Sequence, residues 1–505
     1  MDDSRTKNVS RNIFFGTVNK LTSLIMPFIS RTLMIYLIGT TSLGVSTLFS
    51  SVLSFLSLAE LGFGSAIVYS MYQPIANSDI KLISALLLYY RHLYRIIGFI
   101  VLVIGLALIP FLPHLIAGEI PEGVDLNILF LLYLFNSVIS YFFSGYRQSL
   151  LLANQRADVR DKISMIVNIL VRFSEIIVIY LTRNLYFYVT VMIFGTICTN
   201  VITAIVTRKM FPEIKCEGVV PQEIKNQIKT RLFGLFGTKL NSIVVHQADT
   251  IIISAFLGLK LTTQYGNYYY IISTVSGFVM MFFSSMTASI GNKVVSESSI
   301  EVYKLFKKIN FLNNWIIGWC SICLVCLYHP FMLLWVKSTL TLPVIMSVLM
   351  TIYFYMSQIS RTVLTFKDAA GLWHEDRFRP YVSMVVNLTS NLILIRWLGI
   401  YGIVLSTIIA YIISIPWCNY VLFINLFKKS SLKYNIYQIK QCFITCVIAL
   451  ITYVVCSAFS FSVLGFIGRI VICLFIPNII FVMIFHRSED FAYIKSTLRG
   501  ILSKK

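Results

Sequence analysis

An uncharged apolar stretch indicates the fold class of this chain: residues 186–207 read YFYVTVMIFGTICTNVITAIVT. As an α-helix, a segment of this length crosses the roughly 30 Å hydrocarbon core of a bilayer. Thirteen comparable stretches lie at 11–36, 43–71, 93–113, 126–151, 159–182, 232–257, 264–291, 310–336, 342–366, 380–398, 401–427, 438–460 and 463–486. We therefore predict an all-α integral membrane protein with about fourteen transmembrane helices.

The composition agrees with this class. Hydrophobic residues make up 57% of the chain and charged residues 12%, which lies outside the range of soluble proteins. The stretches are too long for the strands of a β-barrel, which alternate over about ten residues. The stretch 11–36 is too long for a cleavable signal peptide and carries Lys20 and Arg31, so we expect it to form the first transmembrane helix.

The net charge of +21 is unevenly placed along the chain. With the N-terminus inside, most of the 42 Lys and Arg residues fall in the predicted inner segments. The predicted outer loops hold Arg183, Lys260, Lys337, Arg396 and Arg469. This bias predicts a multi-pass cell-membrane protein with both termini cytoplasmic. The basic charge then reflects orientation and contact with anionic lipids, and no nucleic acid is expected as a partner.

Ten cysteines raise the question of a metal site. Nine fall in apolar stretches, and Cys216 falls in an inner segment. Cys320, Cys323 and Cys326 repeat every three residues, but no second Cys or carboxylate pair completes a tetrahedral site. We therefore interpret the cysteines as small apolar side chains and predict no metal or other cofactor.

An internal repeat predicts how the helices are organised. Shifted by 219 residues, the segment 163–169 matches 382–388, and Gly39 matches Gly258. Lys20 matches Lys239 at the same shift, and Arg160 matches Arg379. The shift spans six predicted helices, an even number, so both copies enter the membrane from the same side.

The repeat predicts two parallel six-helix lobes around a central cavity, with two further helices at the C-terminus. The predicted parts are an N-terminal lobe at 1–207, a cytoplasmic linker at 208–231, a C-terminal lobe at 232–430, and two helices with a cytoplasmic tail at 431–505. Rocking of the lobes would open the cavity to each side in turn, which is typical of a transporter. No catalytic constellation is present, so we do not expect an enzyme.

Basic side chains within the apolar stretches are candidates for substrate binding, because a charge in the bilayer is costly. Lys20 and Arg31 lie on one face of the first helix, and Lys239 and His246 share a face of the seventh. Together they would favour an anionic group such as a phosphate or pyrophosphate. Snorkelling to the inner surface is the alternative for Lys20 and Lys239.

Acidic residues in the stretches are fewer. Glu60 could pair with Arg31 or bind a coupling proton or Na⁺. Arg172 and Glu175 lie three residues apart, a spacing that favours an ion pair within one helix. Asp249 follows His246 by three residues, and we interpret it as a solvated helix end in preference to a proton relay.

Further polar residues lie near the predicted inner surface. Arg147 and Arg361 fall near inner helix ends, where they would contact the substrate entrance or lipid headgroups, or snorkel. The run at 374–376, His-Glu-Asp, has no second cluster of ligands, and we interpret it as a solvated loop.

Two motifs resemble a known family. Residues 30–44 read SRTLMIYLIGTTSLG and residues 58–66 read LAELGFGSA. This pattern resembles the polysaccharide-transport branch (O-antigen and capsule repeat-unit flippases, Wzx-type) of the MOP exporter superfamily. In that branch an Arg-containing first helix ends near Leu-Gly and the second ends in an acidic-Leu-Gly element. The likeness extends more loosely to residues 257–266, which read LGLKLTTQYG.

The resemblance implies flipping of an undecaprenyl-pyrophosphate-linked oligosaccharide from the inner to the outer leaflet. It implies that Lys20, Arg31 and Lys239 contact the pyrophosphate and that Glu60 takes the acidic position of the second helix. The second stretch has no basic residue, unlike the arginine-rich flippases of peptidoglycan precursors, which favours a capsule, O-antigen or teichuronic-type unit. Glycosyltransferases and a polymerase of the same pathway are further partners that it implies.

Two other functions remain open. A multidrug or cation antiporter of the related MATE-like type would need carboxylates to dominate the cavity, whereas basic residues outnumber acidic ones in the stretches. A membrane glycan polymerase or ligase would need a long outer loop, but the longest predicted one, 113–125, is short and has no Arg.

Overall fold

The computed structural model describes residues 2–60 and 62–492, except for the side chains of 2–14, 59, 231–236, 238, 285 and 288. Regular structure in these ranges is helical, without a strand, so the all-α class is confirmed. Nine helices of the described part are long and apolar enough to cross a membrane, or up to eleven if each of two bent pairs is one span. The count of fourteen stays a prediction, although every predicted stretch falls on one helix or on consecutive helices.

The chain forms two compact units, unit 1 (Met1–Thr263) and unit 2 (Gln264–Lys505). The helices of unit 1 are α1 (Asp2–Leu37), α2 (Thr40–Leu56), α3 (Phe63–Ala76), α4 (Ile80–Leu108), α5 (Leu126–Phe142), α6 (Gln148–Ala153), α7 (Ala157–Thr182), α8 (Leu185–Met210) and α9 (Gln222–Leu257). Short helical turns are η1 (Ser57–Glu60), η2 (Ile109–Leu115) and η3 (Gly145–Arg147). α10 (Leu259–Ser296) begins in unit 1 and continues in unit 2.

Unit 2 contains α11 (Ser299–Leu340), α12 (Val344–Ile359), α13 (Arg361–Ala369), α14 (Arg379–Leu398), α15 (Ile400–Leu422), the π-helical turn η4 (Phe423–Phe427), α16 (Leu432–Ser457) and α17 (Val463–Phe485). The division into lobes, linker and C-terminal helices stays a prediction, and residues 493–505 of its tail lie outside the described residues.

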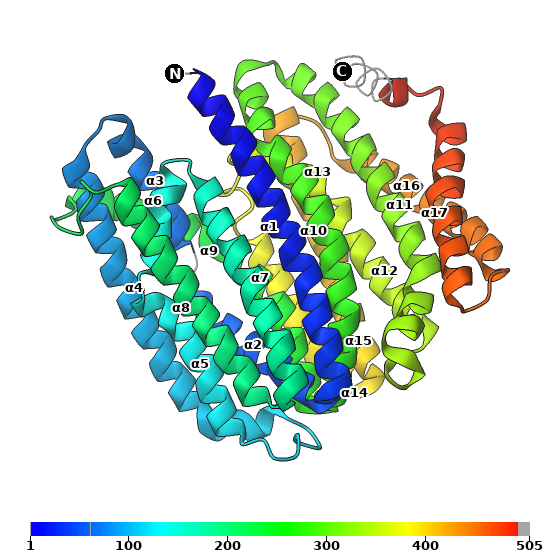
Figure 1. Cartoon of the computed structure of the whole chain (residues 1–505). Helices are drawn as coiled ribbons and strands as arrows, with labels where there is room; N and C mark the ends of the chain where they lie inside the picture. The colour runs from blue at the N-terminus through cyan, green and yellow to red at the C-terminus, as the bar shows by residue number, and fades with distance from the viewer. Residues whose placement is uncertain (1, 61, 493–505) are drawn as a thin grey trace. The chain divides into compact units, whose positions relative to one another are not determined.

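Side-chain caps start several helices of unit 1. The carboxylates of Asp79 and Asp125 accept hydrogen bonds from backbone N–H groups in the first turns of α4 and α5. The side chain of Asn184 does the same for α8. Each cap satisfies N–H groups that the helix itself leaves unpaired. In the assembled unit, α1 lies along α7, α7 packs on α8, and α9 packs on α2 and α3 (Figure 1).

The local structure repeats at the positions that the sequence repeat predicts. α1 and α9 are both 36 residues long. Gly39 follows α1 with φ 112°, and Gly258 follows α9 with φ 87°. Glycine is favoured at both positions, because a side chain disfavours positive φ. The same sharp turn therefore leads into α2 and into α10.

Close backbone packing makes Gly44 on α2 a stability determinant. A Cβ atom there would lie 2.4 Å from the carbonyl oxygen of Leu259, which is backbone and yields poorly. We expect Gly44→Ala to lower the free energy of unfolding by about 1–3 kcal/mol, as overpacking does. Thermal unfolding of the detergent-solubilised protein measures this. Gly291→Ala is the control, because its Cβ would meet its nearest atom at 3.7 Å, an ordinary contact; equal losses in both variants would contradict the argument.

In unit 2, polar side chains join the last two helices to α11. Asn310 on α11 accepts hydrogen bonds from Tyr434 and Gln438 of α16, at 2.9 and 3.0 Å. Trp315 and Trp319 of α11 donate to α17, to the side chain of Asn478 and to the carbonyl of Cys473. Figure 1 shows α16 and α17 side by side, and the two helices are in contact.

Candidate functional site

The second predicted stretch, 43–71, is broken in the structure. α2 ends at Leu56, η1 runs to Glu60, and α3 starts at Phe63 after Gly62, which has φ 84°. Leu61 of the acidic-Leu-Gly element lies outside the described residues. Non-helical backbone at membrane depth is tolerated where it is buried in protein or lines a polar cavity. The break places a carboxylate beside such backbone.

Two tyrosines hold the Glu60 carboxylate. The hydroxyl of Tyr94 on α4 donates to Oε1 at 2.5 Å, and that of Tyr141 on α5 donates to Oε2 at 2.9 Å. The ring of Tyr94 also packs edge-on against Tyr90 and Tyr141, with centroids 4.6 and 5.2 Å apart. Both carboxylate oxygens are therefore bonded, and the orientation of the group is fixed by packed rings.

Glu60 lines a pocket of about 670 Å³ within unit 1. Its lining combines one acid, one base (Lys239 of α9) and tyrosines from α3 and α4. Tyr69 and Tyr72 of α3 are exposed, at 57% and 46%, and their rings meet edge-on at 5.9 Å. The volume is that of a small-molecule site. Ser57, Gln148 and Ser149 add further hydrogen-bonding groups.

This lining suits a ligand with both an anionic and a hydroxyl-rich part. An ammonium group binds phosphate oxygens as a point charge. Tyrosine rings offer flat apolar faces with hydroxyl groups at the edge, and a carboxylate accepts hydrogen bonds from hydroxyl groups. A sugar phosphate presents all of these partners at once.

The structure brings together some of the predicted residues and separates others. Glu60 and Lys239 line the same pocket, whereas Lys20 and Arg31 are not among its lining residues. Lys20 is exposed on α1, and Arg31 is partly buried one position after Ser30. The tyrosines of the pocket were missed, because aromatic residues are abundant and the sequence does not reveal their depth or rotation.

The predicted ion pair within one helix is present on α7. Nη1 of Arg172 lies 2.7 Å from Oε2 of Glu175, which is completely buried. The hydroxyl of Ser30 on α1 donates to the same oxygen at 3.4 Å. This buried carboxylate therefore connects α7 to α1.

The remaining predicted residues lie elsewhere. On α9, His246 is partly buried, and Asp249 is 2% exposed, so the interpretation of Asp249 as a solvated helix end was wrong. Arg147 is buried, with Nη2 3.8 Å from the sulfur of Cys216. Arg361 donates to the side chain of Gln358 at 3.3 Å.

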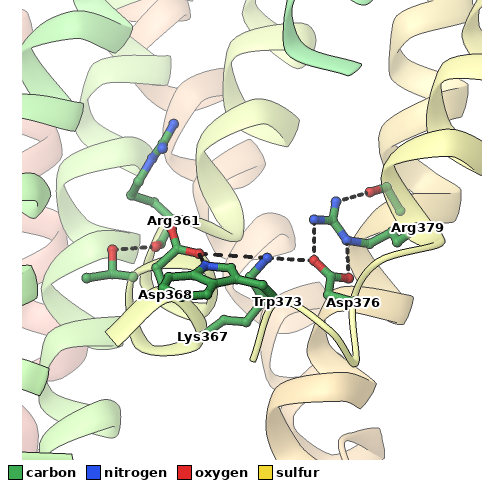
Figure 2. A network of polar contacts seen from close by, with 8 residues as sticks. Arg361, Lys367, Asp368, Trp373, Asp376 and Arg379 are labelled. Atoms are coloured by element: carbon green, nitrogen blue, oxygen red, sulfur yellow. Dashed lines mark hydrogen bonds and ion pairs between the residues drawn. The ribbon is translucent and has the colours of Figure 1, made fainter. Parts of the chain in front are cut away.

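A second polar network occupies the loop between α13 and α14 (Figure 2). Asp376 accepts from Nζ of Lys367 at 2.6 Å and from two nitrogens of Arg379 at 2.6 and 2.7 Å. Arg379 also donates to Ser414 of α15 at 2.8 Å. Asp376 and Lys367 are each 2% exposed, so the interpretation of 374–376 as a solvated loop was wrong for its last residue. In Figure 2 the side chain of Arg361 points away from this network.

The electrostatics of this loop follow from the two cations. Burial alone would raise the pKa of Asp376, but the hydrogen bonds and charges of Arg379 and Lys367 outweigh it and lower the pKa below its usual 3.8. The carboxylate is therefore ionised and fastens the loop to α13 and α14, while Arg379 continues the network to Ser414 of α15.

Comparisons with known proteins identify the fold. No family model and no curated protein sequence matches the chain. Among solved structures, the lipid II flippase MurJ in an inward closed conformation matches 94% of this chain and 99% of its own, with 13% identity and a TM-score of 0.65. A mutant of the Vibrio cholerae MATE transporter VcmN matches 85% of this chain and 99% of its own, with 14% identity and a TM-score of 0.57.

An inward-facing multidrug-resistance MATE transporter of the MOP superfamily matches 80% of this chain and 94% of its own, with 16% identity and a TM-score of 0.56. All of these identities are low, so the likeness concerns the fold. This multi-pass membrane chain therefore has the fold of MurJ and of the MATE transporters, a fold that agrees with the resemblance of its first stretches to the MOP superfamily.

Proposed function

We propose that this protein is a transporter that flips an undecaprenyl-pyrophosphate-linked polysaccharide repeat unit from the inner to the outer leaflet of the cell membrane. The observation that carries the proposal is the pocket of unit 1, where Lys239, Glu60 and exposed tyrosines line one space. The fold supports it, because the likeness to a lipid flippase extends over 94% of the chain, compared with 80–85% for the two MATE transporters.

In this mechanism the ammonium group of Lys239 binds the pyrophosphate and the tyrosines contact the sugars. Lys20, Arg31 and His246 are proposed as further contacts along the path of the headgroup, and Arg147 and Arg361 as contacts at its entrance. The polyprenyl chain stays in lipid. Binding reduces repulsion among the cations and so favours the conformation that opens to the other side, because a ligand shifts an equilibrium towards the state that it binds better.

Proteoliposomes test the proposal directly. The purified protein is reconstituted in vesicles that carry a fluorescent lipid-linked oligosaccharide, and an impermeant reagent reports which leaflet holds the glycan. We expect protein-dependent exchange of the glycan lipid between the leaflets. If the folded protein exchanges the glycan lipid between leaflets no faster than protein-free vesicles do, the proposal is wrong.

A MATE-like cation antiporter is the second candidate. The observation that favours it is the carboxylate of Glu60 among aromatic rings, since both groups attract organic cations. The same vesicles, loaded with a fluorescent organic cation, separate the two functions. Cation exchange against a proton gradient without glycan exchange would favour the antiporter.

Glu60 is the proposed coupling residue in either case. Glu60→Gln keeps the acceptor for one tyrosine hydroxyl but cannot gain or lose a proton. We expect the variant to exchange substrate between leaflets but to lose the acceleration that an imposed proton or Na⁺ gradient gives the wild type. Asp249→Asn and Glu175→Gln, which alter two buried carboxylates elsewhere in unit 1, are the comparison. An unchanged response of Glu60→Gln to both gradients would exclude the role.

A further inference from the structure

Three cysteines from distant parts of the sequence meet inside unit 2. Cys326 lies on α11, Cys456 at the end of α16, and Cys473 on α17. Their sulfur atoms all lie within 4.8 Å of one another. Each residue is at most 1% exposed, and Ile322, Ile448 and Phe481 pack around them. Helix packing thus assembles a thiol cluster in a space that is otherwise apolar.

A buried cation lies next to this cluster. Arg469 is one helical turn before Cys473 and is only 3% exposed. Nη2 donates to the carbonyl of Phe459, just after α16, at 2.6 Å, and the guanidinium lies 4.9 Å from the ring centroid of Phe461. Its buried Nε has no hydrogen-bond partner, and it forms no ion pair with a carboxylate of the described residues. A buried charge without a counter-ion is costly, so a negative group beside Arg469 would be stabilised.

We propose that Cys326, Cys456 and Cys473 bind one thiophilic divalent metal ion, of which Zn²⁺ is the probe. Zinc–sulfur bonds of about 2.3 Å set the sulfurs of a complex about 3.8–4.0 Å apart. Sulfurs that already lie within 4.8 Å therefore need to close by less than about 1 Å.

Charge balance selects a divalent ion. On binding, three S–H bonds break, three protons pass to water, and three thiolates coordinate the metal. Three negative charges and a divalent ion leave one negative charge, which the guanidinium of Arg469 neutralises. A monovalent ion would leave one further negative charge uncompensated in an apolar site. The thiol of Cys323, one turn before Cys326, donates to the backbone carbonyl of Cys473, with the sulfur 3.9 Å from the oxygen.

Such a site would fasten α16 and α17 to α11. Two of the three ligands belong to the last two helices, and the third belongs to the helix on which both pack. Because an ion that binds only the folded state stabilises it, bound metal would raise the temperature at which this part of unit 2 unfolds.

The test uses the full chain in detergent, reduced and stripped of metal. Titration of Zn²⁺ against a chromophoric chelator is expected to show one tightly bound ion per chain and a higher melting temperature. Replacement of Cys326, Cys456 or Cys473 by alanine should weaken zinc binding by more than about 100-fold. Loss of a residue that only hydrogen-bonds to a metal ligand already lowers metal affinity by about 10- to 100-fold. Cys320→Ala on α11 and Cys446→Ala on α16 are the matched controls and should bind as the wild type does.

Three results would overturn the proposal. The first is a wild type that does not compete with the chelator. The second is equal binding in cluster and control variants. The third is a wild type with Cd²⁺ added that shows no thiolate-to-metal charge-transfer absorption, which decides the matter even if a cluster variant fails to fold.

Discussion

Replacement of Lys239 by alanine is expected to reduce glycan export by about 10- to 150-fold without changing the amount of protein in the membrane. Lys239 is the basic residue that lines the pocket. A hydrogen bond to a charged group contributes about 1.5–3 kcal/mol to binding. Lys239→Arg keeps the positive charge and should retain part of the activity. Export is measured in cells as surface polysaccharide and in vesicles as exchange between leaflets.

Lys260→Ala is the matched control for this variant. Lys260 is an exposed lysine in the first turn of α10 and does not line the pocket. It should export as the wild type does. Normal export by Lys239→Ala would show that the pocket does not bind the pyrophosphate. Loss of export in Lys20→Ala and Arg31→Ala alone would place the anion site on α1 instead.

Asp376→Ala is expected to destabilise unit 2 by about 3–5 kcal/mol, the cost of removing one partner of a buried ion pair. The substitution leaves Lys367 and Arg379 buried without their shared carboxylate. Asp376→Asn, which keeps an acceptor but no charge, should lose less. Thermal unfolding in detergent and the level of protein in the membrane report the effect.

Glu375→Ala is the control, because Glu375 is the exposed neighbour of Asp376. It should unfold at the temperature of the wild type, and equal losses in both variants would show that the loop itself is sensitive. The pKa of Asp376 also sets a pH dependence. Because this pKa is lowered on folding, the stabilisation is fully present above the ordinary value of 3.8 and is lost as pH falls through the folded value.

The helices could be predicted from the sequence because the membrane imposes a simple length rule. A stretch such as 186–207 has one stable structure in lipid, where its backbone groups must bond to one another. The structure places α8 at Leu185–Met210, close to the predicted bounds. The repeat of Gly39 and Gly258 was visible for a similar reason, because a turn with positive φ favours one residue type.

The interruption of 43–71 was missed because its composition stays apolar on both sides of the break. A hydropathy average over about twenty residues does not detect the four residues of η1. The break in the helix depends on the positive φ of Gly62 and on the tyrosines that bond to Glu60. The burial of Asp376 was missed as well. In the sequence, a run of three polar residues in a loop is indistinguishable from a solvent-exposed loop. Only the structure shows that Lys367 and Arg379 both bond to Asp376.

The sequence by itself determined the helical class, the repeated local motifs and the residue types that are costly in a membrane, because each is visible in short stretches of the chain. Only the tertiary structure decided which of those residues meet. Glu60, at the end of η1, and Lys239, within α9, line one pocket, and three thiols from three helices form a cluster. Rotation and crossing of packed helices set such contacts, and these depend on side-chain packing along whole helices rather than on any local pattern.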